Sequence, residues 1–202
     1  MSDLVDYALV TLDNTKEVLG ITDDSEDDKI KNLINRATDI IETYCNGRRF
    51  AETTHSNEVY DGTGDYYLPL EHYPVTTLTT LERRTGDFNS PGWDAVESAF
   101  YEIDDDGERG PGMIYYSGGF AEGARNYRVT YIAGYTTIPH DLQQACFKLI
   151  AFLYTQTKAT GMKSESLGEY SYTKADNEST LKELGLDEVL DAYRTPVVAN
   201  IR

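Results

Sequence analysis

The most constraining feature of this sequence is an abrupt change of period in residues 131–154, which read YIAGYTTIPHDLQQACFKLIAFLY. Up to Ala133 the side chains alternate with a period of two, as in a β-strand with one buried face. Gly134 interrupts this pattern, and Pro139 suits the first turn of a helix because its fixed φ is helical and its missing N–H is not needed there. The sequence therefore predicts a strand joined to a helix by a short connection.

The helix after this joint has an apolar surface wider than one face. Ile150 and Phe152 extend the surface beyond its main stripe. A helix of this kind is normally covered on two sides. We expect one cover to be the first long helix of the chain and the other to be the sheet or a neighbouring copy. The main stripe consists of Leu142, Ala145, Cys146, Leu149 and Leu153.

The first long helix is predicted between residues 25 and 45. SEDD at Ser25–Asp28 offers a small polar cap followed by carboxylates, which favour the positive end of a helix dipole. Asn46-Gly47 is a good left-handed stop, and a shorter helix is expected at residues 15–19, ending at Gly20. The stripe of the long helix consists of Ile30, Leu33, Ile34, Ala37, Ile40, Ile41 and Tyr44, at steps of three and four.

Residues 50–133 are rich in Thr, Tyr, Val and Gly and contain three turn signals, which predicts a β-rich region. In the last expected strand Tyr127, Val129, Tyr131 and Ala133 share one face. The strands are predicted at residues 58–60, 66–70, 75–83, 100–103, 113–116 and 127–133.

Beyond Gly161 the pattern predicts one acidic helix from Leu181 to Tyr193, which Pro196 ends. Val197, Val198 and Ile201 then form an apolar strip too small to fold on itself. We expect this strip to lie on a larger surface, either of its own chain or of another molecule.

The composition is that of a folded chain, with 40% hydrophobic and 26% charged residues among 202. Lys and Arg number 18 against 35 Asp and Glu, a net charge of −17, which disfavours non-specific binding to nucleic acid or an anionic membrane. The longest apolar run, LIAFLY, is far below the about 20 residues of a membrane span. Asp3 and Asp6 argue against a signal peptide, so synthesis in the cytosol and reduced, buried Cys45 and Cys146 are expected.

Tyrosine is over-represented, with 16 residues against a single Trp. Several lie in polar stretches, where an aromatic core would not place them. Because tyrosine has an apolar ring and a polar hydroxyl, we interpret this excess as a sign of extensive contacts with other proteins.

Motifs for catalysis or metal binding are weak. The stretch 102–113, EIDDDGERGPGM, imitates a calcium loop, but Met113 stands where a bidentate Glu is required. SESLG at 164–168 resembles a nucleophile elbow, but Ser164 stands where that motif needs Gly. His55, His72 and His140 are far apart in sequence, without partners at metal-ligand spacing, and are interpreted as exposed or turn histidines. We therefore expect no catalytic residue, metal or cofactor.

An acidic-capped helix that ends in a Gly and four later stretches, taken in order, resemble the head-tail connector, or head-completion adaptor, family of tailed bacteriophages. The similarity covers nearly the whole chain, although residues 85–125 are more elaborate than the usual hairpin and their role stays open. The stretches are YDGTGDYYLPLEHYPVTTL (60–78), VTYIAGYTTIPHDLQQACFKLIAFLY (129–154), SESLGEYSY (164–172) and DAYRTP (191–196).

The resemblance implies an α+β fold, in which a helical bundle formed by residues 1–49 and 134–202 bears a β-rich insertion, residues 50–133. It also implies a structural protein rather than an enzyme. Such a protein forms a homo-oligomeric ring, commonly a dodecamer, under the portal in the virion neck. It contacts the portal protein and a downstream neck or tail protein, and DNA passes through the ring without specific binding.

Two alternatives stay open. One is another neck or tail-end ring protein, such as a stopper. The other, of a different class, is a small calcium-dependent binding module or hydrolase that uses residues 102–113 and 164–168.

The residues predicted to form interfaces are Tyr131, Tyr135, Phe152, Ser166, Leu167, Tyr170, Tyr172, Val197, Val198 and Ile201.

Overall fold

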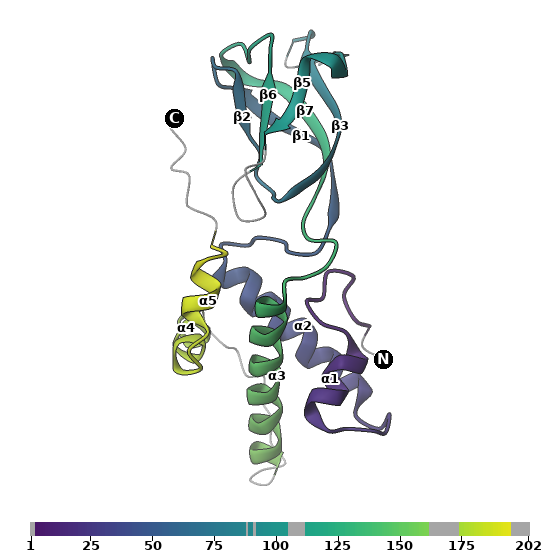
Figure 1. Cartoon of the computed structure of the whole chain (residues 1–202), viewed down its shortest axis with the longest axis vertical. Helices are drawn as coiled ribbons and strands as arrows, with labels where there is room; N and C mark the ends of the chain where they lie inside the picture. Colours follow the sequence, from purple (N-terminus) through teal and green to yellow (C-terminus); the bar gives the residue numbers. More distant parts are fainter. Residues whose placement is uncertain (1–2, 88, 91, 105–111, 162–173, 195–202) are drawn as a thin grey trace. The chain divides into compact units, whose positions relative to one another are not determined.

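The computed structural model describes residues 3–87, 89–90, 92–104, 112–161 and 174–194 (Figure 1). The chain divides into two compact units, a helical unit of Met1–Phe50 with Thr137–Arg202 and a β unit of Ala51–Thr136. This mixture of helices and strands agrees with the predicted α+β class. Within the described residues, no helix is both long and apolar enough to cross a membrane.

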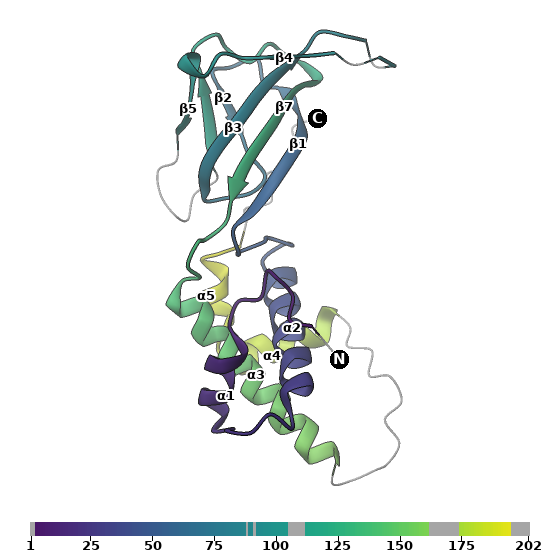
Figure 2. The same cartoon turned by 90° about the vertical axis from the view of Figure 1, so that its right-hand side faces the viewer.

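The helical unit is organised around two long helices, α2 and α3, which pack against each other (Figure 2). Helix α1 contacts both of them, and α5 contacts α3. The helices are α1 (Leu12–Leu19), α2 (Asp27–Tyr44), α3 (His140–Gly161), α4 (Lys174–Glu183) and α5 (Asp187–Asp191).

The apolar stripes of α2 and α3 are buried as predicted. All seven stripe residues of α2 are buried, and so are all five main-stripe residues of α3. Ile150 is also buried, whereas Phe152 is half-buried. The other helices of the same unit therefore cover most of the wide apolar surface of α3.

Two predictions about helix ends were wrong. Glu26, not Ser25, occupies the N-cap of α2, and the Ser25 hydroxyl donates to Asp23 instead. The acidic helix predicted from Leu181 to Tyr193 is two helices, because Gly185 adopts a left-handed φ of 62° and ends α4. There the Leu186 N–H donates to the Leu181 carbonyl at 2.9 Å, a closure that stops a helix.

The predicted stop of the long helix is confirmed. Asn46 and Gly47 both have positive φ, 63° and 78°, just beyond the end of α2. The Gly47 N–H donates to the Glu42 carbonyl at 2.7 Å, the six-residue closure of a Schellman motif. This turn leads the chain out of α2 towards Phe50.

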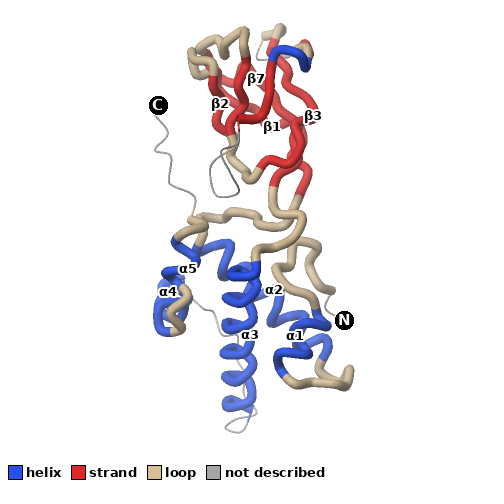
Figure 3. The backbone as a smooth tube through the Cα atoms, viewed as in Figure 1, coloured by secondary structure: helices blue, strands red, loops and turns tan. Residues whose placement is uncertain are grey.

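The β unit contains two antiparallel sheets, of four strands in the order β1-β7-β3-β4 and of three in the order β2-β6-β5 (Figure 3). The short strand β4 was not predicted, because its three residues follow a polar stretch and show no alternation. The strands are β1 (Thr53–Gly62), β2 (Tyr67–Pro69), β3 (Val75–Arg84), β4 (Trp93–Ala95), β5 (Tyr101–Asp104), β6 (Met113–Tyr116) and β7 (Gly123–Ala133), with a 3-10 turn at Ser98–Phe100.

One hydrophobic core serves both sheets. The predicted inner face of β7 is confirmed, with Tyr127, Val129, Tyr131 and Ala133 all buried. Side chains of the smaller sheet, such as Ile114, join them in the same cluster. The alternation of β7 therefore sets one wall of the core, as a period of two requires.

The interpretation of the tyrosines needs correction, because seven of those described are buried. Their rings fill the two cores, and several of their hydroxyls bond to carboxylates, as Tyr193 does with Asp141 at 2.7 Å. A large share of the tyrosine excess therefore stabilises the protomer itself. The seven are Tyr44, Tyr73, Tyr127, Tyr131, Tyr135, Tyr154 and Tyr193.

Candidate functional site

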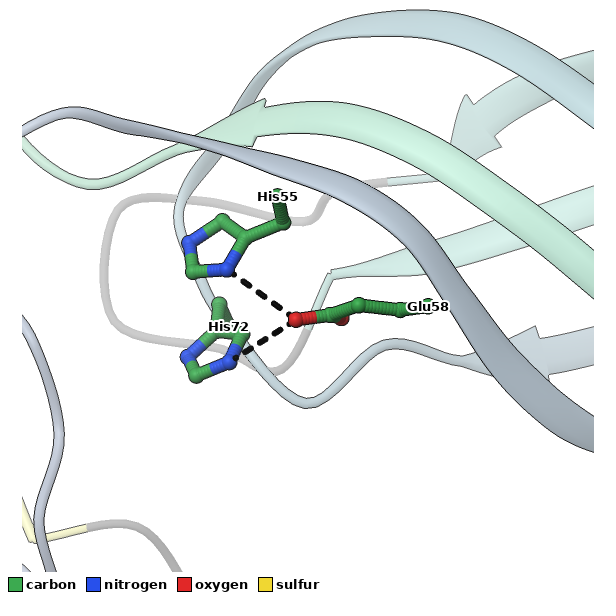
Figure 4. A group of neighbouring side chains, drawn as sticks. All are labelled: His55, Glu58 and His72. Carbon is green, nitrogen blue, oxygen red and sulfur yellow. Dashed lines mark hydrogen bonds and ion pairs between the residues drawn. The ribbon is translucent and has the colours of Figure 1, made fainter.

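The β unit contains a cluster of polar side chains that comes from three chain segments, and Figure 4 shows three of its members, His55, Glu58 and His72. His55 and Glu58 lie on β1, and His72 lies in the connection between β2 and β3. One ligand-type atom from each of these three residues lies within 4.8 Å of the other two. Tyr60 of β1 and Tyr131 of β7 contact the same carboxylate. We call these five residues the His-Glu cluster.

An irregularity in β1 places His55 and Glu58 on the same side of the sheet. His55 pairs with Tyr131 and Glu58 pairs with Val129, so β1 carries one extra residue between the two pairs. Asn57 takes up this extra residue with a positive φ of 58°, and its N–H donates to the Thr130 hydroxyl at 3.1 Å. Side chains three apart in a regular strand would point to opposite faces, so the bulge re-aims one of them.

The two oxygens of Glu58 have different partners. Oε2 accepts hydrogen bonds from the hydroxyls of Tyr60 and Tyr131, each at 2.7 Å. Oε1 faces the two imidazoles, 3.1 Å from Nδ1 of His55 and 3.4 Å from Nε2 of His72. The tyrosines therefore fix the orientation of the carboxylate and leave its second oxygen to the histidines.

The histidine rings stack on each other, with centroids 3.8 Å apart and planes 14° from parallel. The His55 ring also stacks on Tyr131, at 5.1 Å. Nε2 of His55 is buried without a hydrogen-bond partner. A hydrogen bond also fixes the backbone just before His72, because the Glu71 N–H donates to the Tyr60 hydroxyl at 3.3 Å.

The electrostatics of the cluster keep Glu58 ionised and the tyrosines neutral. Burial alone would raise the pKa of Glu58, but hydrogen bonds from His72, Tyr131 and Tyr60 outweigh it and hold that pKa at about 2. Burial and the neighbouring Tyr60 and Glu58 raise the pKa of Tyr131 well above its usual range. Burial and the charge of His72 lower the pKa of His55 against the opposing effect of Glu58.

His55, His72 and His140 were predicted to be exposed or turn histidines without partners at metal-ligand spacing. His72 does lie in a connection, but His55 lies on β1, and the imidazoles of both contact Glu58. Their sequence separation hid the contact, because pairing of β1 with β7 and the return of the chain after β2 bring them together. Only the sequence HSNE (55–58) carries a local signal, since Asn favours the left-handed conformation that a bulge needs. His140, the third histidine, is the first residue of α3.

Of the predicted interface residues, Tyr131 and Tyr135 lie in the β unit and Phe152 lies on α3. Tyr131 and Tyr135 are buried, at 0% and 7% exposure, which agrees with a packing role near the joint. The interface role of these three residues stays a prediction. The others lie outside the described residues: Ser166, Leu167, Tyr170, Tyr172, Val197, Val198 and Ile201.

The two motifs considered for chemistry also fall mostly outside the described residues. Glu102 and Asp104 lie on β5, and the rest of the calcium-like stretch up to residue 111 is not described. The SESLG stretch, 164–168, is not described either. The structure therefore adds nothing to the alternative of a calcium module or hydrolase.

The described surface of the β unit also exposes large aromatic side chains at one end of the smaller sheet. Tyr66, Tyr67 and Phe100 are 52%, 41% and 51% exposed. Their segments flank the end of β6, where the Tyr116 N–H donates to the Tyr66 carbonyl and the Ser117 N–H to the Phe100 carbonyl, both at 2.9 Å. We call these three side chains the aromatic patch.

The structure is similar to a chain in the neck of an empty GTA particle computed with C6 symmetry, with a TM-score of 0.59 and 18% sequence identity. The similarity covers 98% of this chain and 96% of that one.

Residues 8–195 match the head completion protein family, so the chain belongs to that family. No curated protein matches the chain. The resemblance to the head-completion adaptor family noted in the sequence is thereby confirmed.

Proposed function

We propose that this protein is a head-tail connector, or adaptor, that forms a ring under the portal of a tailed phage or phage-like particle. Membership of the head completion protein family over residues 8–195 carries this proposal. The solved relative in fold belongs to a neck computed with C6 symmetry, which supports a ring of identical copies. The copy number proposed is twelve, as the sequence resemblance implies.

The charge of the chain supports a passive passage for DNA. With a net charge of −17 per copy, the protein has too few clustered cations to release the counterions of DNA. We expect no retention of duplex DNA by the free protein at physiological salt. Micromolar, salt-sensitive binding in a filter assay would contradict a passive passage.

We further propose that residues 50–133 form an insertion in a helical bundle, and that both parts supply contacts between copies. The aromatic patch offers exposed apolar surface of the type found at interface cores. Tyr67→Ser and Phe100→Ser are expected to weaken ring formation without lowering the Tm of the protomer. Val18→Ser, at another exposed apolar residue (53% exposed), is the matched control.

Residues 195–202 are proposed to contact a neighbouring subunit or the portal. Their removal is expected to leave circular dichroism and Tm nearly unchanged while it weakens attachment to portal-containing heads. A truncated protein that melts several degrees lower yet still completes heads would show that these residues belong to the fold of the protomer instead.

The test of the function itself is the location of the protein in assembling particles. Heads that lack it are expected to retain DNA poorly and to accept no tails, and the added protein should co-purify with the portal. Co-purification with the tail tube instead of the portal would favour a stopper or tail-end ring protein.

A further inference from the structure

We propose that His55, Glu58 and His72 bind a divalent transition-metal ion of the zinc class, which would tie β1 to the connection between β2 and β3. The proposal rests on the geometry of the His-Glu cluster and is independent of the neck function. Two imidazole nitrogens and one carboxylate oxygen form a donor set that zinc accepts, usually with a water completing four-coordination.

The spacing of the donor atoms suits such an ion. Ligand atoms about 2.0–2.1 Å from a tetrahedral zinc ion lie about 3.3 Å from one another. Oε1 of Glu58 lies 3.1 Å from Nδ1 of His55 and 3.4 Å from Nε2 of His72. The ion would replace the protons that those nitrogens otherwise donate to the carboxylate.

The carboxylate that would bind the ion is held in place by two neighbouring hydroxyls. The Tyr60 and Tyr131 hydroxyls hold Oε2 of Glu58, which fixes the direction of the free oxygen. Partners of this type orient metal ligands, and their loss commonly costs about 10–100-fold in affinity. Burial is partial, since the side chains of His72 and Glu58 are 25% and 26% exposed, so an ion can enter from solvent.

Binding requires one change. The ring planes are 14° from parallel, and an ion must lie close to the plane of each imidazole that binds it. At least one ring must therefore turn about its Cβ–Cγ bond. The more exposed His72 has more room for this turn than His55, whose side chain is only 11% exposed.

The first experiment uses the full chain after removal of metals with a chelator. Titration with Co²⁺ should produce the visible absorption of a tetrahedral site with one ion per chain. Zn²⁺ should displace Co²⁺ and raise the Tm, because a ligand that binds only the folded state stabilises it. Excess Ca²⁺ should not displace Co²⁺, since calcium prefers oxygen ligands.

Variants assign the site. His72→Gln and Glu58→Gln should lose at least 100-fold in Co²⁺ affinity, and Tyr131→Phe should lose about 10-fold, because it removes a hydroxyl that orients Glu58. His140→Gln, which alters the histidine on α3, is the matched control and should bind as the original chain does. Circular dichroism without metal confirms that each variant is folded, and a variant that does not fold is replaced by His55→Gln.

Two outcomes would overturn the proposal. One is a folded original chain that binds neither Co²⁺ nor Zn²⁺ at 100 times the protein concentration. The other is Co²⁺ binding that survives in folded His72→Gln and Glu58→Gln, which would place the ion elsewhere. In either case the cluster is a hydrogen-bonded polar group without a metal.

Discussion

The helical unit contains a buried glutamate and the β unit a half-buried one, and the two carboxylates also differ in the number of donors around them. Glu42 on α2 is 4% exposed; its Oε2 pairs with Arg49 at 2.5 Å, but its Oε1 is buried without a partner. Glu58 on β1 has two tyrosine hydroxyls and two imidazoles around its two oxygens.

The consequence is an opposite shift of the two pKa values. Burial raises the pKa of Glu42 from 4.5 to about 7, although the charge of Arg49 opposes this. Hydrogen bonds overcome burial at Glu58 and lower its pKa to about 2. Glu42 is also the more buried of the two, with its side chain 6% exposed against 26% for Glu58. Deeper burial and fewer donors therefore favour the neutral form at Glu42, and the larger number of donors favours the charged form at Glu58.

The largest loss of stability is expected when a carboxylate is placed in an apolar core. Leu149→Asp puts one into the core of the helical unit, at a residue with 0% exposure. An unpaired charge at such a position destabilises by several kcal/mol and should unfold this unit. Loss of helical circular dichroism would show it.

Phe152→Asp is the comparison variant, because Phe152 on the same helix is half-buried. We expect it to lower the Tm less than Leu149→Asp and to impair ring assembly more than folding. Equal melting of the two variants, with rings formed by both, would show that α3 has no second apolar contact.

The next largest loss of stability is expected when one of the hydroxyls that donate to Glu58 is removed. Tyr131→Phe deletes a hydroxyl that bonds to the carboxylate at 2.7 Å and to the Tyr60 hydroxyl at 3.0 Å. Hydrogen bonds to charged groups contribute about 1.5–3 kcal/mol, so the free energy of unfolding should fall by that amount. Urea denaturation measures it.

A double-mutant cycle with Tyr60→Phe sharpens this result. Because both hydroxyls bind the same oxygen and each other, the two losses should not add. Strict additivity would mean that the hydroxyls act independently and that the donors around Glu58 do not form one network.

A pH-dependent effect is expected at Glu42. Its pKa is higher in the folded chain than its usual 4.5, so the folded state binds the extra proton between pH 4.5 and 7. Stability should therefore fall as the pH rises through this window, relative to Glu42→Gln, by about 10 °C in Tm.

Asp28→Asn is the matched control for this measurement, because Asp28 is an exposed carboxylate on the same helix. The Tm difference between this variant and the original chain should vary little over that pH range. If the Glu42→Gln difference also stayed constant with pH, burial at Glu42 would not outweigh Arg49.

The smallest effect is expected for Glu82 on β3, a partly exposed carboxylate that pairs with one arginine. Glu82 receives two bonds from Arg128, at 2.7 and 2.8 Å, and the guanidinium also lies over the Trp93 ring at 4.7 Å. Such pairs contribute about 0.2–1 kcal/mol and weaken with salt. Glu82→Gln should cost no more than this, and the cost should shrink in high salt; a larger, salt-insensitive loss would contradict it.

The two units also differ in how far the sequence predicts them. The stripes of α2 and α3 and the end of α2 at Asn46-Gly47 are local patterns, and each was predicted correctly. The inner face of β7 follows from a period of two and was predicted as well. Local geometry alone determines these features.

The His-Glu cluster could not be predicted in the same way. It requires the one-residue bulge at Asn57, the register of β1 against β7 and the position of a connection fourteen residues beyond Glu58. The division of the last acidic helix at Gly185 was overlooked for another reason, because apolar spacing continued across the break. The periodicity of apolar residues reveals neither long-range strand pairing nor a local helix stop of this kind.

The central claim, a neck protein that forms a ring on the portal, is tested most directly by the mass of the complex with the portal protein. Native mass spectrometry of the purified chain mixed with portal rings should show the portal mass plus twelve copies of this chain, with few intermediate species. A complex with one or two copies, or no complex with portal while the chain binds tail tube, would contradict the claim.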